Sequence, residues 1–306
     1  MFCRSDELKA LRSPRMPSLV TALPAARTRT RLPNAISTRE HVVLDSHRII
    51  TNMAKRKIDG VETVSEAPTT KAAKMQPTKT QRQDDKELVE RVNTMSAMDF
   101  CSDYIDDSWL RYAINGPGNA VNAYEIAIKP SRAMSPVELS SCLSLVESTS
   151  RQDYENSSWG WRPRRKRREM CEPEMWYLLV SMVHDIAQPA NYSIDGFLSF
   201  MITHDSDPHV PVLYIYEIHL AERLRKVGLG AHLMQTAEKI AEKIGLQKVM
   251  LTCFLSNAKA LGFYKKRGYA ADACSPEARR TRSKVVEPDY VIMSRPVKAT
   301  AAHVPG

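Results

Sequence analysis

The sequence predicts an α/β (α+β) fold, and three observations support this prediction. A run of β-branched and aromatic residues at 212–220 is typical of a strand, and it leads through a turn with Gly228 and Gly230 into an amphipathic helix pattern that ends near Gly245. Further strand and helix patterns lie on both sides of this segment. Hydrophobic residues make up 43% of the 306 residues, which is enough to build a core.

Charge divides the chain into a basic tail and a neutral domain. Residues 1–83 hold 16 Lys and Arg against 7 Asp and Glu, and the remaining residues hold 28 of each sign. The whole net charge of +9 therefore belongs to the tail. We predict a disordered basic extension at 1–83, a folded domain at 84–300 and a short tail at 301–306.

The composition of the extension leaves several interpretations open. Residues 1–52 are poor in acids and rich in Arg, Ser and Thr, which fits a mitochondrial presequence or plain disorder, and we favour disorder. Met53 offers a second start of translation beside Met1. The basic segment at 55–57 fits a weak nuclear-import signal or a solvated tail.

Before the central strand, we expect two helices and three antiparallel strands. Leu88, Val92, Met95 and Met98 recur at helical spacing after capping-type residues, so a helix should pack on the domain from about Asp84. The next elements are expected to be a strand at 124–129, a helix at 135–150 and strands at 175–182 and 193–205.

After the central strand and its turn, helix and strand patterns continue to alternate along the chain. We expect a helix at 230–244, a strand at 249–255, a helix at 258–266 and a last strand at 290–295. Residues 270–286 are polar and charged, and they read as a loop.

An aromatic and basic stretch lies between the predicted helix at 135–150 and the predicted strand at 175–182. Trp159 and Trp161 flank a glycine, and the basic run 162–168 follows. Such a pattern could hold a nucleic acid by stacking and phosphate contact. A packed aromatic plug beside a solvated helix is the alternative, which we favour because no other feature of nucleic-acid binding is present.

The sequence contains no pattern typical of a metal site or a membrane span. The six cysteines are widely spaced without a C-x-x-C pair, which predicts neither a zinc site nor a disulfide framework. No apolar run approaches the ~18 residues that a membrane span needs. We therefore expect no metal and no contact with a membrane.

Two motifs carry a resemblance to a known superfamily. Arg225 to Gly230 fits Arg/Gln-x-x-Gly-x-Gly, and Asn257 to Tyr264 fits Asn-x-x-Ala-x-x-x-Tyr. With the strand between them, these motifs resemble the GNAT acyltransferase superfamily. The resemblance implies a mixed, mostly antiparallel sheet with a splayed central strand pair, helices on both faces, and acetyl-CoA as co-substrate.

In that superfamily, glycines let the diphosphate of coenzyme A approach the backbone at the start of a helix, where the helix dipole favours an anion. The matching positions here are Ile218, His219, Leu220, Arg225, Lys226, Val227, Gly228, Leu229, Gly230 and Asn257. Val227 departs from the pattern, since a basic residue is usual before the first glycine.

A longer resemblance covers residues 85–297. The segments 154–161, 162–170 and 212–217 are similar to the N-alpha-acetyltransferase D family, which acetylates the amino termini of histone H4 and the 2A-type histone. The resemblance implies direct acetyl transfer to the N-terminal serine of Ser-Gly-Arg-Gly tails in a ternary complex. A lysine or small-amine acetyltransferase and a non-catalytic chromatin-binding module are the alternatives.

In this family a glutamate on the central strand acts as the base, and Glu217 matches it. We expect partial burial to raise the pKa of Glu217, so that it takes a proton directly or through water. An exposed glutamate at a strand end is the alternative. Strand alternation would place Tyr214 and Tyr216 on one face and Glu217 on the other, unless the strand bulges, as the resemblance implies.

The substrate-binding positions also follow from the resemblance. Two acidic residues that hold the arginine of the tail correspond to Asp205 and Asp207, which could instead belong to a solvated hairpin turn. The aromatic residues that line the peptide tunnel correspond to Tyr154, Trp159, Tyr214, Tyr216 and Tyr290.

The departing thiolate needs a proton, and Tyr264 or Tyr290 could give it. Cys253 would allow transfer through an acetyl-cysteine, which we set aside because no histidine lies near it in the sequence to activate the thiol. The expected partners are the two histone tails, and the basic extension could add a weak contact with DNA or the ribosome. We expect a monomer in the nucleus and cytoplasm.

Overall fold

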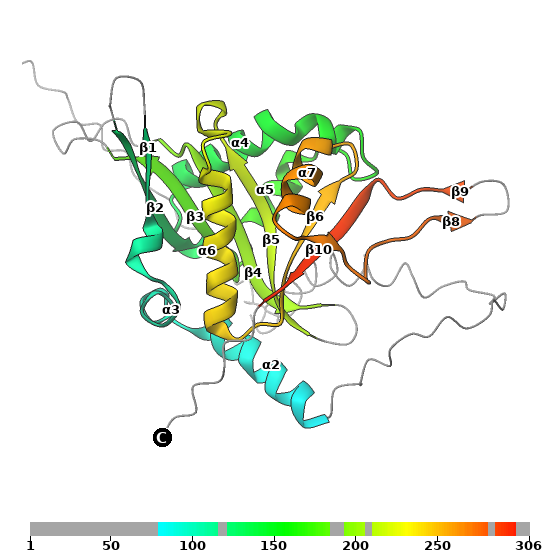
Figure 1. Cartoon of the computed structure of the whole chain (residues 1–306), viewed down its shortest axis with the longest axis horizontal. Coiled ribbons are helices and arrows are strands. Elements are labelled where there is room, and N and C mark those ends of the chain that lie inside the picture. The colour runs from blue at the N-terminus through cyan, green and yellow to red at the C-terminus, as the bar shows by residue number, and fades with distance from the viewer. Residues whose placement is uncertain (1–78, 116–120, 184–192, 206–209, 281–284, 298–306) are drawn as a thin grey trace, which may run out of the picture. The chain divides into compact units, whose positions relative to one another are not determined.

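The computed structural model describes residues 79–115, 121–183, 193–205, 210–280 and 285–297 (Figure 1). Residues 1–78 of the predicted extension and the tail at 301–306 lie outside the described residues. The helices are α2 (Lys79–Thr94), α3 (Ala97–Tyr104), α4 (Pro136–Glu155), α5 (Pro163–Met170), α6 (Leu229–Ile244) and α7 (Ala258–Lys266). The strands are β1 (Arg111–Asn115), β2 (Val121–Pro130), β3 (Trp176–Met182), β4 (Gly196–His204), β5 (Pro211–Leu220), β6 (Lys248–Phe254), β7 (Ala270–Ala271), β8 (Arg279–Arg280), β9 (Val285–Val286) and β10 (Tyr290–Pro296).

Eight of the described strands form one sheet in the order β1-β2-β3-β4-β5-β6-β10-β7. Neighbouring strands are antiparallel except for β5 and β6, which run parallel. The remaining strands, β8 and β9, pair with each other. The predicted mixed, mostly antiparallel sheet is confirmed.

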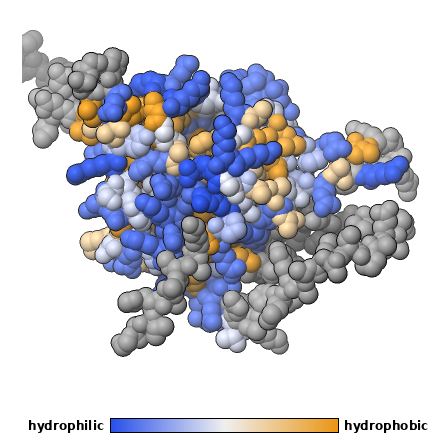
Figure 2. Space-filling view, viewed as in Figure 1, coloured by the Kyte–Doolittle hydropathy of each residue, from blue (hydrophilic) through white to orange (hydrophobic). Residues whose placement is uncertain are grey.

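Helices cover both faces of this sheet (Figure 1). On one face, α2, α3 and α6 bury a large apolar cluster that includes Val92, Leu213 and Leu233. On the other face, α4 and α5 pack over a second cluster around Tyr177 and Phe197. Figure 2 shows that the α6 side of the domain is largely hydrophilic, with apolar residues only in separate groups. Among the described residues, no helix is long and apolar enough to cross a membrane.

The N-terminal helical region differs from the prediction in two ways. The helix α2 begins at Lys79, ahead of the predicted Asp84. The prediction missed its first turn because the residues there are polar and show no apolar residues at helical spacing. The predicted helix is also divided at Ser96, whose hydroxyl accepts a hydrogen bond from the Asp99 amide and so caps α3. Met98 therefore falls on the outer side of α3, with 78% of its surface exposed, and its predicted place in the core was wrong.

The sequence prediction also missed an edge strand. Four strands precede β5 rather than three, because β1 pairs with β2 along its whole length. Only alternate residues of β1 are partly buried, and a short edge strand of this kind has a weak pattern. The predicted loop at 270–286 contains the short strands β7, β8 and β9.

A capping box fixes the start of α4. Ser135 accepts a hydrogen bond from the Glu138 amide, Glu138 accepts one from the Ser135 amide, and Pro136 occupies the first turn. The helix runs to Glu155, beyond its predicted end at 150, so Tyr154 lies on its last turn. This extension brings Tyr154 to the middle of the sheet.

Candidate active site

A β-bulge organises the centre of the sheet. Opposite β4, Glu217 pairs with Ser199 and Ile215 pairs with Phe200, so Tyr216 is the extra residue. Tyr216 packs against the α4–α5 cluster, and Glu217 bonds Tyr154 of α4, so both side chains lie on that face. Simple alternation would have separated them; the bulge that the resemblance implied is present.

The two central strands separate beyond this point. The parallel pairing of β5 and β6 begins at Val212 and Lys248 and ends at Ile215 and Leu251. Both strands continue past these residues without pairing to each other, and the predicted splayed pair is confirmed. The backbone of residues 216–220 is therefore free of a ladder on the β6 side.

The turn before α6 has the geometry of an anion-binding loop. Gly228 is the N-cap of α6 with φ +89°, Lys226 has φ +64°, and no side chain caps the helix. The first-turn amides of α6 are therefore open to a ligand. Tyr112 of β1 donates a hydrogen bond to the Val227 carbonyl at 2.8 Å and holds the turn from outside.

Apart from Asn257, the predicted coenzyme-binding residues lie at the end of β5, in this turn and at the start of α6, but several can offer only backbone. Leu229 is fully buried in the core, and the side chains of Ile218 and Leu220 pack against the same cluster. The Arg225 guanidinium reaches back to the Leu220 carbonyl at 3.1 Å. A Cβ on Gly230 would come within 3.5 Å of Leu220, an ordinary contact.

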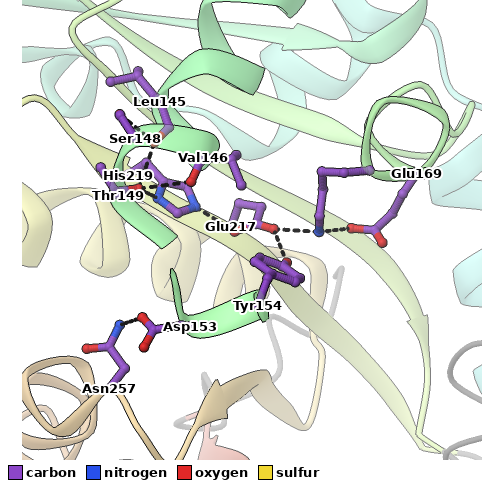
Figure 3. A network of polar contacts seen from close by, with 11 residues as sticks. Leu145, Val146, Ser148, Thr149, Asp153, Tyr154, Glu169, Glu217, His219 and Asn257 are labelled. Atoms are coloured by element: carbon purple, nitrogen blue, oxygen red, sulfur yellow. Dashed lines mark hydrogen bonds and ion pairs between the residues drawn. The ribbon is translucent and has the colours of Figure 1, made fainter. Parts of the chain in front are cut away.

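Glu217 lies at the centre of a buried polar network (Figure 3). Its Oε1 accepts hydrogen bonds from Lys166 Nζ at 2.6 Å and from Tyr154 Oη at 3.0 Å. Its Oε2 lies 2.5 Å from His219 Nε2, and His219 Nδ1 lies 2.5 Å from Thr149 Oγ1. The sequence prediction missed Lys166 and Thr149 and assigned His219 to the cofactor rather than to this network.

The predicted direction of the Glu217 pKa was wrong. Burial by itself raises the pKa of this carboxyl, but the positive charge of Lys166 and the contact with His219 outweigh burial and lower the pKa well below its usual value. Burial favours neutral Lys166 in the same way, while Glu169 and Glu217 raise the pKa of its amine above the usual value. Glu217 is therefore an anion paired with a buried cation.

Aromatic side chains gather beside Glu217. The Trp159 ring lies 6.5 Å from Tyr154, 5.6 Å from Phe254 and 5.4 Å from Tyr290, measured between ring centroids. The Trp161 ring also lies near Tyr154, with 5.6 Å between centroids. These contacts agree with the aromatic plug rather than with free rings for nucleic-acid stacking.

Tyr214 and Tyr216 extend the aromatic group along β5, with ring centroids 5.3 Å apart. The Tyr214 hydroxyl lies 2.5 Å from Thr252 Oγ1. The Tyr216 hydroxyl is buried and has no hydrogen-bond partner among the described residues. A buried phenol without a partner is costly, and it indicates a position where a ligand could complete the hydrogen bond.

Only one of the two predicted acidic residues can be placed, because Asp207 lies outside the described residues. Asp205 bonds Lys248, whose Nζ also donates to Asp272 at 2.7 Å. Asp205, Asp272 and Cys274 each offer a ligand atom within 4.8 Å of the others, but Lys248 already bonds both carboxylates. Asp205 is thus part of an ion-pair group at the end of β4.

The two candidate acids lie on different sides of the site. Tyr264 of α7 belongs to the cluster on the α6 side, and the neighbouring Phe263 ring faces Gly230 of the turn. Tyr290 at the start of β10 lies with Trp159 and the β5 tyrosines. Burial raises the pKa of Tyr264, so its hydroxyl keeps its proton at neutral pH.

Asn257 and Cys253 have local structural contacts. The Asn257 side chain accepts from the Ala260 amide at 3.0 Å as the N-cap of α7 and donates to Asp153 at 3.0 Å. A role toward acetyl-CoA for Asn257 stays a prediction. Burial raises the pKa of the Cys253 thiol to about 12, as expected for a core residue rather than a nucleophile.

The basic run 162–168 forms most of α5 and has two sides. Lys166 points inward to Glu217, while Arg162, Arg164, Arg165 and Arg168 are exposed. None of these four arginines forms an ion pair with a carboxylate of the described residues. The solvated helix face that the sequence suggested is therefore present.

Comparison with known proteins bears on the fold. The sheet order, the splayed strand pair and the glycine turn define the GNAT class of fold. Residues 151–269 match the family described as "Acetyltransferase (GNAT) family".

Individual proteins are similar to this chain over part of its length. N-alpha-acetyltransferase 40 of Saccharomyces cerevisiae is 33% identical over 114 residues, a match that covers 30% of this chain and 40% of the yeast protein. Arabidopsis thaliana NAA60 in complex with a bisubstrate analogue has 15% identity and a TM-score of 0.39, over 56% of this chain and 99% of that chain. The NatC complex bound to Gag peptide and CoA has 16% identity and a TM-score of 0.39, over 57% and 99%.

Proposed function

We propose that this protein is an N-alpha-acetyltransferase that transfers the acetyl group of acetyl-CoA to the N-terminal serine of histone H4 and the 2A-type histone. One observation carries the proposal above all. A buried, ionised carboxylate, Glu217, lies at the point where β5 and β6 separate, among the aromatic side chains of Tyr154, Trp159 and Tyr216.

The residues around the turn fit acetyl-CoA. The open amides at the start of α6 and the positive φ of Gly228 suit a diphosphate, while the unpaired backbone of 216–220 suits the amide groups of a pantetheine arm. When bound, acetyl-CoA supplies an acetyl group activated as a thioester. The N–C bond forms as the C–S bond breaks, so the amine must lose one proton and the sulfur must gain one.

The other side of the site fits an amine. An α-amine has an ordinary pKa of about 8, so part of it is neutral near pH 7 and needs little help to lose its proton. Because its pKa is lowered, Glu217 is a weaker proton acceptor than the sequence predicts, and its negative charge favours binding of the amine. Tyr264 keeps its proton and lies on the side of the turn, which suits it to protonate the sulfur.

Selectivity for a small first residue would come from the ring contacts of Trp159 and from the unpartnered Tyr216 hydroxyl. Asp205 at the end of β4 would hold the substrate's arginine together with Asp207. The similarity to a yeast protein named N-alpha-acetyltransferase 40 supports an α-amine as acceptor. Action in the nucleus and cytoplasm as a monomer belongs to the same proposal.

Peptide acetylation followed by mass spectrometry tests this function. The substrate peptide begins Ser-Gly-Arg-Gly, and the controls are Ser-Gly-Ala-Gly and a version whose amino terminus is blocked but whose lysines are free. We expect one acetyl group, on the α-amine of the first peptide, and a much higher KM for the second. Acetylation of the blocked peptide at the same rate would show a lysine acetyltransferase, and no acetylation of any amine would refute enzyme function.

A further inference from the structure

The buried network around Glu217 contains more charge than a proton acceptor requires. Lys166 Nζ lies 2.6 Å from Glu217 Oε1 and 2.5 Å from Glu169 Oε1, so one lysine joins two carboxylates. Only 7% of the Lys166 side chain and 8% of the Glu217 side chain are exposed. A charge pair removed from water to this degree costs several kcal/mol to bury, and a well-packed apolar pair would be as stable. Stability is therefore a poor explanation for it.

We propose that Lys166 is a positioning residue for acetyl transfer, which fixes the orientation of the Glu217 carboxylate and preserves its negative charge. The proposal rests on the proposed function, and it adds a residue of α5 to the site. Its action is through Glu217, because the Lys166 ammonium is enclosed by Glu169, Glu217 and the Tyr154 ring, whose centroid is 5.0 Å away.

The geometry shows how the orientation is fixed. Oε1 accepts from both Lys166 and Tyr154, and Oε2 faces His219, whose other nitrogen is held by Thr149 of α4. A carboxylate has about four lone-pair directions, so these three contacts leave about one for a substrate amine. Without Lys166, Oε1 would lose its charged partner, and the carboxylate could rotate.

The charge balance of the network is also suited to an amine. Counted by themselves, Glu169 and Glu217 against Lys166 give a net charge of one negative unit. The α-ammonium of a peptide would neutralise that unit. If Lys166 were uncharged, two neighbouring carboxylates would remain, and Glu217 would take up a proton at higher pH, since both burial and a like charge oppose its ionisation.

The remaining ionisable groups around Glu217 do not compete for this role. Among the described residues, those that interact electrostatically with the network include the phenols Tyr154 of α4, Tyr177 of β3, Tyr216 of β5 and Tyr264 of α7. Burial raises the pKa of each, so all four stay neutral through the pH range of an assay. The charge at Glu217 is therefore controlled by Lys166, Glu169 and His219.

The test measures kcat/KM against pH for Lys166→Met, Lys166→Arg and Glu169→Gln in the full chain. In Lys166→Met the pKa of Glu217 should rise by about one to three units, because an adjacent cation normally lowers a carboxyl pKa by that amount, so the activity of this variant should fall further below wild type along the acidic limb as pH decreases. Lys166→Arg should keep the wild-type limb. Glu169→Gln removes a like charge, so its limb should stay or move downward.

A control ion pair is available elsewhere in the domain. Lys129 bonds Glu138 at 2.7 Å, another ion pair between a lysine and a buried glutamate, at the far end of α4 from Tyr154. Because 35% of the Lys129 side chain is exposed, Lys129→Met should lose less stability than Lys166→Met, and it should leave the pH profile unchanged. A Lys166→Met profile that is lowered equally at every pH, like a loss of folded protein, would refute the positioning role.

A second readout does not depend on activity. Carbon-13 labelling of glutamate side chains lets NMR follow the titration of Glu217 directly, with Glu217→Gln to assign its signal. Glu217 should titrate at higher pH in Lys166→Met than in wild type, and equal titration would overturn the inference. If the wild type acetylates no peptide while this titration shifts as expected, the proposed function fails and the role of Lys166 in charging Glu217 stands.

Discussion

The turn before α6 allows a prediction in which conformation and ligand binding can be separated. In Gly228→Ala, the alanine backbone would have to keep φ +89°, and its Cβ would meet the Tyr112 hydroxyl at 2.5 Å. A left-handed conformation costs an L-residue about 1–2 kcal/mol. Displacing Tyr112 from the Val227 carbonyl adds about 1 kcal/mol for the lost hydrogen bond. We expect the free energy of unfolding to fall by about 2–3 kcal/mol.

Gly245 at the other end of α6 is the matched control. It has φ +86°, and no atom lies within 4 Å of a Cβ added to it. The free energy of unfolding of Gly245→Ala should therefore fall only by the cost of the left-handed conformation, about 1–2 kcal/mol. Urea unfolding compares the two variants, and the double variant Gly228→Ala with Tyr112→Phe should lose less than the sum of its single changes, because phenylalanine has no oxygen for the Cβ to meet.

Measurement of CoA binding tests whether the turn before α6 holds the diphosphate. Calorimetry should show that Gly228→Ala weakens CoA binding about tenfold or more, which is ~1.4 kcal/mol, because strain at the N-cap displaces the open amides of α6. Gly245→Ala should bind CoA as the wild type does. Equal CoA affinity in both variants would show that the diphosphate binds elsewhere and would refute the assignment of this turn.

Three further predictions concern single side chains. Tyr216→Phe removes a buried hydroxyl that has no partner among the described residues, so thermal stability should stay or rise while KM for the peptide increases; an unchanged KM would exclude a contact between this hydroxyl and the substrate. Lys248→Met should lower the free energy of unfolding at neutral pH, because Lys248 helps to hold the pKa of Asp272 below its usual value. A lowered carboxyl pKa stabilises the fold above the unfolded pKa and loses that effect as pH falls, so acid titration of wild type and variant should make their stabilities converge, and a constant difference would contradict the ion pair. Cys253→Ala should keep kcat within a few-fold and form no acetylated enzyme in mass spectra, whereas loss of all activity in a folded variant would favour transfer through the thiol.

The parts of the fold that were predictable from sequence have strong local signals. The helix at 258–266 was predicted with its actual ends, since Asn257 caps it and its apolar residues repeat at helical spacing. The glycine turn and the strand before it were equally clear. The edge strand β1 was not, because three of its five residues are exposed and nothing local distinguishes it from a loop.

The chemistry of the site was less predictable than its location. The contact between Lys166 and Glu217 joins residues 51 apart, and the run of basic residues does not show which one points inward. The buried Met170 and the start of α5 at Pro163 set the phase of that helix. His219 had a usable signal, because it is two residues from Glu217 on a strand and so shares its face.

The extra residue in β5 has a consequence for how densely functional groups can be arranged. On one face of a regular strand, successive side chains are separated by two residues, about 6.6 Å. At the bulge, Tyr216 and Glu217 are consecutive and lie on the same face, so their Cα atoms are only about 3.8 Å apart. A single strand thereby presents an aromatic ring and a negative charge side by side, without any help from a loop.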